Sequence, residues 1–337
     1  MSAIESNIVN TNRHKLEDVI PLSTPYSLAI DPSNLCNFKC KFCAMQASKE
    51  KQNYKKQCME LSLFKKIIDD INGFPDKLKV LRLSAQGEPL LNKDLPEMIR
   101  YAKKKEVAEY IEIVTNGSRL NPILNQELID SGVDRIRISI EAVDEEGYLE
   151  IAGVKIDLQN FIRNIKDLHI RSGEKCEIYI KIVDAAVKEP HQKEKFKAEF
   201  SGICDRIWID NIIPLWSDFE ELTQNFDILN DKGVHGQKIQ KVEICPFSFY
   251  NLIINPDGQV TVCCADWKRK LVVGDLKIES MMNVWNGDKL RNFWVDMLNG
   301  NRKKYEMCRK CLLPSYDCND NIDAYAEQIL SRIQKEK

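Results

Sequence analysis

The chain carries, at residues 34–43, the stretch Asn34-Leu35-Cys36-Asn37-Phe38-Lys39-Cys40-Lys41-Phe42-Cys43, which follows closely on a strand-like segment at residues 27–31. Its three cysteines have the spacing C-x3-C-x2-C. Three thiolates can hold three irons of a 4Fe-4S cluster and leave the fourth iron open to a small molecule. A tetrahedral zinc site needs four ligands, and no further Cys or His lies nearby in the sequence. Cysteines clustered in this way indicate metal or redox chemistry rather than unrelated buried thiols.

Composition excludes several classes of function. The 337 residues include 49 Lys and Arg against 51 Asp and Glu, a net charge of -2, so no basic field for nucleic acid is present. Residues 1–13 are polar, which argues against a signal peptide, and no apolar run approaches the ~20 residues of a membrane span. We therefore expect a cytoplasmic protein with no membrane partner. The 12 cysteines are then more plausible as ligands than as disulfides.

The apolar residues alternate between short β-rich runs and longer runs of helical period. The pattern predicts strands at 27–31, 78–84, 110–115, 135–140, 177–184 and 206–210, with helices at 62–72, 94–105, 123–131, 158–171 and 193–200. Such alternation predicts an α/β fold with a parallel sheet and right-handed crossovers. Because it stops near residue 210, we expect an open, TIM-like partial (β/α)6 barrel. Ligands bind at the carboxyl ends of such strands, where the three cysteines lie.

A second group of cysteines lies in the last third of the chain. Cys263 follows Cys245 after 17 residues, and the pair Cys308 and Cys311 comes 44 residues later. Residues 255–258, Asn-Pro-Asp-Gly, predict a hairpin between the first two. Four cysteines from a hairpin and a C-x2-C pair can close a zinc site or a cluster site, and the spacing alone favours neither.

The first motif resembles that of the radical S-adenosylmethionine (SAM) enzymes, in which an aromatic residue precedes the third cysteine, as Phe42 does here. The run Gln86-Gly87-Glu88-Pro89 is similar to the family's G-G-E-P turn, whose backbone meets the SAM amino group; Gln86 departs from it. Asn116, Ser139 and Glu141 follow or end later strands and resemble the groups that contact the SAM carboxylate and ribose. The resemblance implies SAM as cofactor, with a 4Fe-4S cluster on Cys36, Cys40 and Cys43.

The second group is similar to the SPASM/twitch extension of these enzymes. The similarity rests on Cys245, Gly258, Cys263, Cys308 and Cys311. Cys318 follows after six residues instead of five, and the chain then has no further cysteine. The shorter twitch form, with one auxiliary 4Fe-4S cluster, is therefore the better match, as in the group that contains an aminocyclitol dehydrogenase. We expect a strap at residues 1–26, the barrel at 27–215, a small α+β twitch domain with a β-hairpin at 240–320, and a terminal helix at 321–337.

The resemblance implies reductive cleavage of SAM, abstraction of hydrogen from a substrate, and oxidation of a secondary alcohol with the auxiliary cluster as electron acceptor. Cys264 lies next to the expected ligand Cys263. As a donor of a hydrogen atom it would make the protein an epimerase; the other interpretation is that Cys264 is only a small buried side chain. Asp266 is a candidate base. A peptide- or protein-modifying maturase is a further alternative. A non-catalytic iron-sulfur or zinc module would explain the second cysteine group but not the first.

Substrate and partners are inferred mainly from the resemblance. Peptide-modifying relatives usually carry an N-terminal leader-binding domain of about 80 residues, whereas only ~26 residues precede the first predicted strand here. We therefore favour a small sugar, polyol or aminocyclitol over a peptide, with a flavodoxin- or ferredoxin-type electron donor. Four residues lie in segments that could line the pocket: Arg206, Trp208, Trp216 and Trp267.

Overall fold

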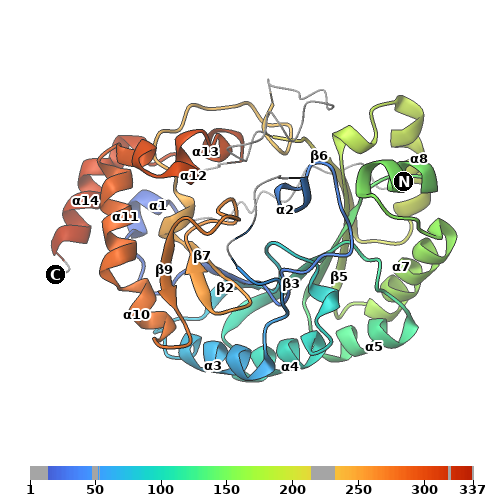
Figure 1. The fold of residues 1–337 in the computed structure, drawn as a ribbon, viewed down its shortest axis with the longest axis horizontal. Coiled ribbons are helices and arrows are strands. Elements are labelled where there is room, and N and C mark those ends of the chain that lie inside the picture. Colours follow the sequence, from blue (N-terminus) through green and yellow to red (C-terminus); the bar gives the residue numbers. More distant parts are fainter. Residues whose placement is uncertain (1–13, 48–51, 53, 214–231, 318–319, 336–337) are drawn as a thin grey trace.

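The computed structural model describes residues 14–47, 52, 54–213, 232–317 and 320–335. Its centre is one sheet of nine strands in the order β6-β5-β4-β3-β2-β1-β7-β8-β9 (Figure 1). The first six strands are parallel: β1 (Ser27–Ile30), β2 (Leu78–Arg82), β3 (Ala108–Thr115), β4 (Arg135–Ile140), β5 (Glu177–Val183) and β6 (Arg206–Asp210). The predicted alternation and the mixed α/β fold with a parallel sheet are confirmed.

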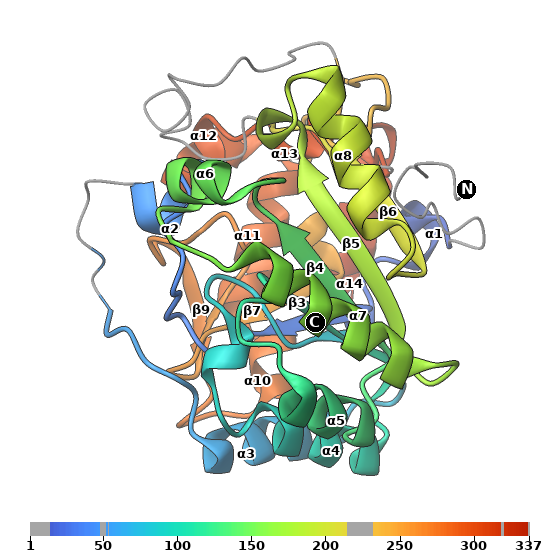
Figure 2. The ribbon, with the colours of Figure 1, turned by 90° about the vertical axis from the view of Figure 1, so that its right-hand side faces the viewer.

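Crossover helices cover the outer face of the parallel strands (Figures 1 and 2). They are α3 (Leu61–Ile71), α4 (Leu95–Lys105), α5 (Pro122–Asp130), α7 (Leu158–Ser172) and α8 (Pro190–Phe200). Local sequence sets their starts: the side chain of Asn121 accepts hydrogen bonds from two backbone amides of α5, and that of Asp157 accepts one, from the amide of Asn160 in α7. A proline stands in the first turn of α4, α5 and α8, where its missing N–H costs nothing.

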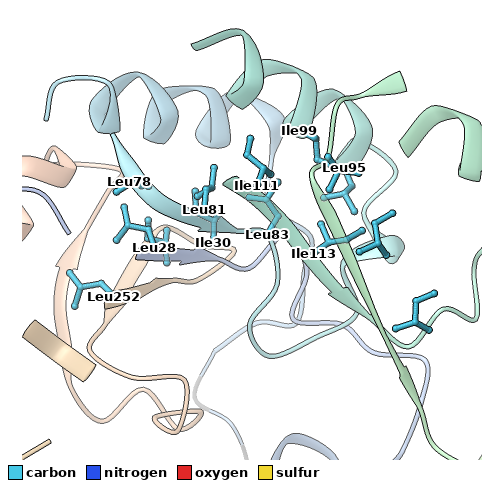
Figure 3. Close-up of a cluster of buried hydrophobic side chains, with 14 of the residues drawn as sticks. Leu28, Ile30, Leu78, Leu81, Leu83, Leu95, Ile99, Ile111, Ile113 and Leu252 are labelled. Carbon is cyan, nitrogen blue, oxygen red and sulfur yellow. The ribbon is translucent and has the colours of Figure 1, made fainter. Parts of the chain in front are cut away.

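The main core lies between the sheet and these helices. Figure 3 shows Leu81 and Ile111 from the strands beneath Leu95 and Ile99 of α4, and all four are buried. Because strand side chains alternate between faces, the residues between these apolar positions face the barrel interior. In β4 the apolar set is Ile136, Ile138 and Ile140, which leaves Arg135, Arg137 and Ser139 for the inner face. The interior is therefore polar, unlike that of a sheet buried on both faces.

The last third of the chain extends the same sheet. Strand β7 (Asn251–Ile254) pairs parallel to β1, and β8 (Gln259–Thr261) and β9 (Val272–Asp275) continue it antiparallel. The predicted hairpin is present, and Gly258 adopts φ +84°, which a glycine accommodates without strain. No local sequence pattern indicates the pairing with β1. An edge strand of an open barrel carries unpaired backbone groups, and β7 satisfies them.

The remaining helices flank these strands and the ends of the sheet. They are α1 (Leu16–Val19), α2 (Ala44–Ala47), α6 (Glu145–Gly147), α10 (Met281–Trp285), α11 (Asp288–Leu298), α12 (Glu306–Arg309), α13 (Leu313–Tyr316) and α14 (Ala326–Lys335). A short π-helical turn spans Tyr148–Ala152, and 3-10 turns span Pro89–Leu91, Asp184–Ala186, Phe247–Phe249, Asn301–Lys304 and Asp323–Tyr325. None of the helices described here is both long and apolar enough to cross a bilayer. The four-part division of the chain stays a prediction.

Candidate functional site

The three cysteines of the first motif lie on a loop after β1, at the carboxyl end of the parallel strands. The loop is tied to the segment after β4, because the amides of Lys39 and Lys41 donate to the carbonyls of Ala152 and Ile151 at 2.8 and 2.9 Å. Cys40 is buried, and Cys36 and Cys43 are half-buried. The site thus lies where ligands bind in folds of this kind.

The thiols of this loop lie close enough to affect one another electrostatically. Burial raises the pKa of Cys36 to about 11, and the neighbouring Glu88 and Cys43 add to the shift. Burial also raises the pKa of Cys40, with contributions from Glu141, Cys43 and Cys36. Thiolates in such a place need a cation beside them, and soft sulfur ligands suit iron-sulfur clusters. The residues present therefore fit a cluster. Over the described ranges, no three Cys, His, Asp or Glu side chains converge on the position of a single metal ion.

The turn at residues 86–89 packs directly on the cysteine loop. The amide of Glu88 donates to the carbonyl of Leu35 at 2.7 Å. A Cβ atom at Gly87 would lie 2.0 Å from the carbonyl oxygen of Ser33 and 2.5 Å from that of Leu35, so only glycine fits. Pro89 is buried at the start of its 3-10 turn. The turn therefore fixes the loop that carries Cys36.

The carboxylate of Glu88 holds strand ends together. It is buried and accepts from the Thr115 hydroxyl at 2.5 Å and from the amides of Leu90 and Asn116 at 3.0 and 2.7 Å. Burial raises its pKa to about 7, although these hydrogen bonds oppose the shift. By contrast, the side-chain amide of Gln86 is buried with no hydrogen-bond partner in the part of the chain that the structure describes. Gln86 is thus the residue of the turn whose side-chain amide has unused hydrogen-bonding capacity.

Asn116 and Glu141 also lie beside the cysteines. The Nδ2 atom of Asn116 is 4.0 Å from the sulfur of Cys36. Burial raises the pKa of Glu141 to about 7, and Lys181 and a hydrogen bond with Cys40 oppose the shift. Ser139 lies in register with Lys181 on the next strand. The residues expected to meet SAM therefore lie at one end of the sheet, although they come from three separate segments.

The four cysteines of the second group line one apolar hollow. Cys245, Cys263, Cys308 and Cys311 share it with several side chains that are mostly apolar, namely Phe247, Val262, Phe293, Arg302, Met307 and Leu313. Burial raises the pKa of Cys308 to about 12 and raises that of Cys245, and in both cases Cys311 adds to the shift. Four thiols facing one hollow have the donor chemistry of a cluster site.

Cys264 and Asp266 lie next to this hollow in very different settings. Cys264 is exposed, yet the structure places it near Arg82 of β2 and near Asp317. Its pKa is lowered first by a hydrogen bond with Cys263 and then by the charge of Arg82. Asp266 is buried, and its two oxygens each accept a backbone amide, from Lys270 and Leu271 at 2.8 Å. These contacts favour a structural role for Asp266.

A charged network on the inner face of the barrel escaped the sequence reasoning. Glu112 of β3 is 1% exposed and contacts guanidinium groups of Arg82, Arg137 and Arg135 at 2.6, 3.2 and 3.5 Å. Farther along, Asp210 accepts from Lys181, Trp208 and His235 at 3.2, 2.9 and 3.1 Å. The polar positions of β4, β5 and β6 alternate with isoleucines, and this alternation was the signal that could have revealed the network.

The structure describes three of the four residues that the sequence suggested for lining the pocket. Arg206 and Trp208 lie on β6 at positions of the inner face. Trp267 is buried against Ala44 and Met45. Trp216 and Cys318 lie outside the described residues.

Two family profiles match the chain. The profile of the radical SAM superfamily matches residues 30–182, and that of an iron-sulfur cluster-binding domain, SPASM, matches residues 245–312. A probable GTP 3',8-cyclase of Methanococcus maripaludis is 33% identical over 133 residues, which are 39% of this chain and 41% of that protein. A tungsten-containing aldehyde ferredoxin oxidoreductase cofactor-modifying protein of Pyrococcus furiosus is 31% identical over 116 residues, 34% of this chain and 31% of that one. The matched part thus spans less than half of either relative.

Solved structures share the fold across most of the chain. BtrN in complex with AdoMet and 2-DOIA aligns with a TM-score of 0.54 at 18% identity, covering 85% of this chain and 92% of BtrN. SuiB of Streptococcus suis bound to S-adenosylmethionine aligns with a TM-score of 0.63 at 16% identity, covering 92% and 76%. The protein anSMEcpe with bound AdoMet gives 0.58 at 17% identity and covers 93% of both chains. At these identities the likeness concerns the fold alone.

Proposed function

The chain belongs to the radical SAM superfamily and carries a C-terminal iron-sulfur cluster-binding domain, and from this premise we propose that it oxidises a secondary alcohol of a small substrate inside the barrel. The two domains imply SAM, a 4Fe-4S cluster and auxiliary iron-sulfur as cofactors. When bound, the reduced cluster and SAM supply a 5'-deoxyadenosyl radical that takes a hydrogen atom, and an auxiliary cluster supplies an acceptor for the electron that the substrate then loses with a proton.

We assign the SAM-binding cluster to Cys36, Cys40 and Cys43. The turn Gln86-Gly87-Glu88-Pro89 holds this loop in place, and we propose that its backbone also meets the SAM amino group. Asn116, Ser139 and Glu141 are proposed to meet the carboxylate and ribose. The support is their convergence: Glu88, Asn116 and Glu141 all lie beside the cysteines although they are up to about a hundred residues away in sequence.

One observation carries the oxidation proposal: the two cysteine groups border the same interior. The first group is connected to the interior by Glu141, which lies next to Cys40 and near Lys181. The second, assigned to one auxiliary cluster on Cys245, Cys263, Cys308 and Cys311, reaches it through Cys264, near Arg82. A substrate between them would be accessible to a radical from one side and to an electron acceptor from the other. The chain's part is to orient the substrate and keep competing reactants away.

Radical epimerisation is the second candidate, because the exposed thiol of Cys264 is a hydrogen-atom donor at the same interior. A peptide substrate is the alternative to a sugar, polyol or aminocyclitol. The neighbours include both kinds of complex, since SuiB has been solved with its precursor peptide and BtrN with 2-DOIA. A flavodoxin- or ferredoxin-type donor is proposed for the reducing electron. We propose no base role for Asp266, whose oxygens are occupied by backbone amides.

The test is the content of iron, sulfide and zinc per chain after anaerobic reconstitution. We expect about eight irons in the wild type and about four in the C36A/C40A/C43A variant, which should also make no 5'-deoxyadenosine from SAM and dithionite. The control is Cys204→Ala, because the thiol of Cys204 contacts the carbonyl of Phe200 just before the start of β6, whereas the cysteine loop lies at the other, carboxyl end of the strands. Undiminished 5'-deoxyadenosine from the triple variant would contradict the proposal. Four irons falling to none, with one zinc kept, would remove the electron acceptor and favour epimerisation.

A further inference from the structure

On the inner face of the barrel, three arginines gather around one buried carboxylate, that of Glu112. Glu112 faces three arginines, but Arg135 has a partner of its own, since its Nη2 lies 2.7 Å from Glu177. Its guanidinium also stacks over Tyr110 and Tyr179, 4.6 Å from each ring centre. Glu112 is therefore shared by Arg82 and Arg137, which amounts to one carboxylate for two guanidinium groups.

Among the described residues, the neighbouring carboxylates of the interior contact other groups. Glu88 and Glu141 lie beside the cysteine loop. Asp210 pairs with Lys181 at 3.2 Å and with His235 at 3.1 Å, and His235 also lies 3.4 Å from Asp317. Two carboxylates and two cationic side chains thus balance within this second group. Asp317 and the thiol of Cys264 also act electrostatically on Arg82, so the arginine with unused capacity is Arg137.

Arg137 has hydrogen-bonding capacity that the described residues do not use. A guanidinium has five N–H donors, and its only ion-pair contact here joins Nη2 to Glu112 at 3.2 Å. Its Nε is buried without a hydrogen-bond partner among those residues. Burial lowers the pKa of Arg137, and the charges of Arg82 and Arg135 lower it further while Glu112 opposes them. A half-buried cation in this state gains most from an oxyanion that accepts two of its donors.

The position is open to a ligand. The side chain of Arg82 is 43% exposed and that of Arg137 is 20% exposed, although both project from central strands whose outer face is covered by helices. Arg137 stands two residues before Ser139 on the same face of β4. At ~3.3 Å per residue, the two side chains are about 7 Å apart along the strand. This distance suits a small molecule with an anionic group at Arg137 and a reacting carbon near Ser139.

We propose that Arg137, with Arg82 beside it, binds an oxyanion of the substrate, either a carboxylate or a phosphate, in the barrel interior. This inference rests on the proposed function, since it takes the interior to be the substrate site. It narrows the substrate class from neutral polyols and cationic aminocyclitols to acidic sugars, sugar phosphates or comparable small anions. Arg137 would fix the substrate by a two-pronged contact that a lysine cannot reproduce.

Calorimetric titration of the reconstituted protein with three probes tests the proposal. Glucose 6-phosphate represents the phosphate class, glucuronate the carboxylate class, and glucose the neutral form. We expect at least one anionic probe to bind and glucose not to bind. Arg137→Gln should weaken binding of that probe by about ten- to a hundredfold, the usual effect of losing hydrogen bonds to a charged group. The affinity of Arg137→Lys for that probe should lie between the affinities of the wild type and of Arg137→Gln. Binding of glucose 6-phosphate would identify the oxyanion as a phosphate, and binding of glucuronate would identify it as a carboxylate.

Arg100→Gln is the matched control, because Arg100 lies on the outer helix α4 and pairs only with Glu97 among the described residues. It should bind the probe as the wild type does. Iron content and circular dichroism establish that Arg137→Gln is folded; if it is not, the comparison of Arg137→Lys with the wild type decides. The proposal is overturned if neither anion binds, if glucose binds equally well, or if binding is unchanged in the Arg137 variants.

The same wild-type preparation is assayed for 5'-deoxyadenosine formation without substrate, which separates the two proposals. Formation of 5'-deoxyadenosine without anion binding would overturn the oxyanion site and leave the proposed function standing. Anion binding that depends on Arg137, without 5'-deoxyadenosine, would support the site while contradicting the proposed function.

Discussion

Cys263 and Cys264 are neighbours in the chain but lie in different environments. Cys263 lines the apolar hollow with the other three cysteines of its group, whereas Cys264 is exposed near Arg82. They follow strand β8 and residue Val262, and Cys263 begins a turn, since its carbonyl accepts from the amide of Asp266 at 3.1 Å. We therefore propose that Cys263 binds a cluster and that Cys264 meets a substrate.

Alanine substitution of each residue should separate these roles. We expect Cys263→Ala to lose about four of eight irons after anaerobic reconstitution, because a cluster on four thiolates loses a ligand. Cys264→Ala should keep all of its iron, which makes it the matched control. Iron and sulfide analysis, with the ultraviolet-visible spectrum, provides the measurement. Loss of iron from Cys264→Ala and not from Cys263→Ala would reverse the assignment.

At the scale of elements, the turn at residues 86–89 shows how a short motif controls a distant loop. Its Gly87 is in contact with the backbone of residues 33–35, and its Glu88 joins that loop to the end of β3. The cysteine loop therefore depends on the turn after β2 for its shape.

Gly87→Ala should displace the cysteine loop. The added methyl would lie 2.0 Å from the Ser33 carbonyl oxygen, and backbone cannot move aside as a flexible side chain can. We expect a loss of about 3 kcal/mol in the free energy of unfolding, at the upper end for overpacking, and loss of iron from the first site. Gly202→Ala is the control, because no atom lies within 4 Å of its added Cβ. Urea unfolding and iron analysis measure both, and a Gly87→Ala protein as stable and iron-loaded as the wild type would contradict this account.

Elements of strong period were predictable from the sequence, and their distant pairings were not. The bounds predicted for β4 and β6 agree with the structure, because isoleucines alternate with polar residues in both. The parallel pairing of β7 with β1 joins residues more than 200 positions apart, and no local pattern encodes it. The cysteine spacings identified both candidate sites. The alternation shows which charged residues of one strand share a face, but it does not show that arginines of β2 and β4 meet Glu112 of β3, which depends on strand order and register.

At the scale of the whole molecule, side-chain contacts link the barrel to the C-terminal region. Asp210 ends the last parallel strand, and Asp317 follows α13; His235 lies between them, 3.1 Å from the first and 3.4 Å from the second. A second contact joins the two ends of the chain, because Arg332 of α14 donates to the carbonyl of Asp18 at 2.9 Å. The contacts of His235 thus join the end of β6 to the segment that follows α13.

The contribution of His235 to stability should depend on pH. Burial by itself would lower its pKa, but hydrogen bonds to Asp210 and Asp317 outweigh burial and raise the pKa to about 9. A folded-state pKa above the ordinary value of ~6.5 means that the contribution is complete below about pH 6.5 and is lost as the pH rises through 9. We expect His235→Gln to be about 2 kcal/mol less stable than the wild type at pH 6, after allowance for partial exposure.

The measurement is urea unfolding of the reconstituted wild type and His235→Gln between pH 6 and 9.5, followed by circular dichroism under anaerobic conditions. The difference between the two should shrink steadily from pH 7 upward and largely vanish above pH 9, because the unprotonated imidazole no longer carries the charge that attracts the two carboxylates. His191→Gln, at an exposed position near the start of α8, controls for the removal of a surface histidine. A difference that stayed constant with pH, or grew toward pH 9, would mean that His235 joins the two regions by packing and not through its charge.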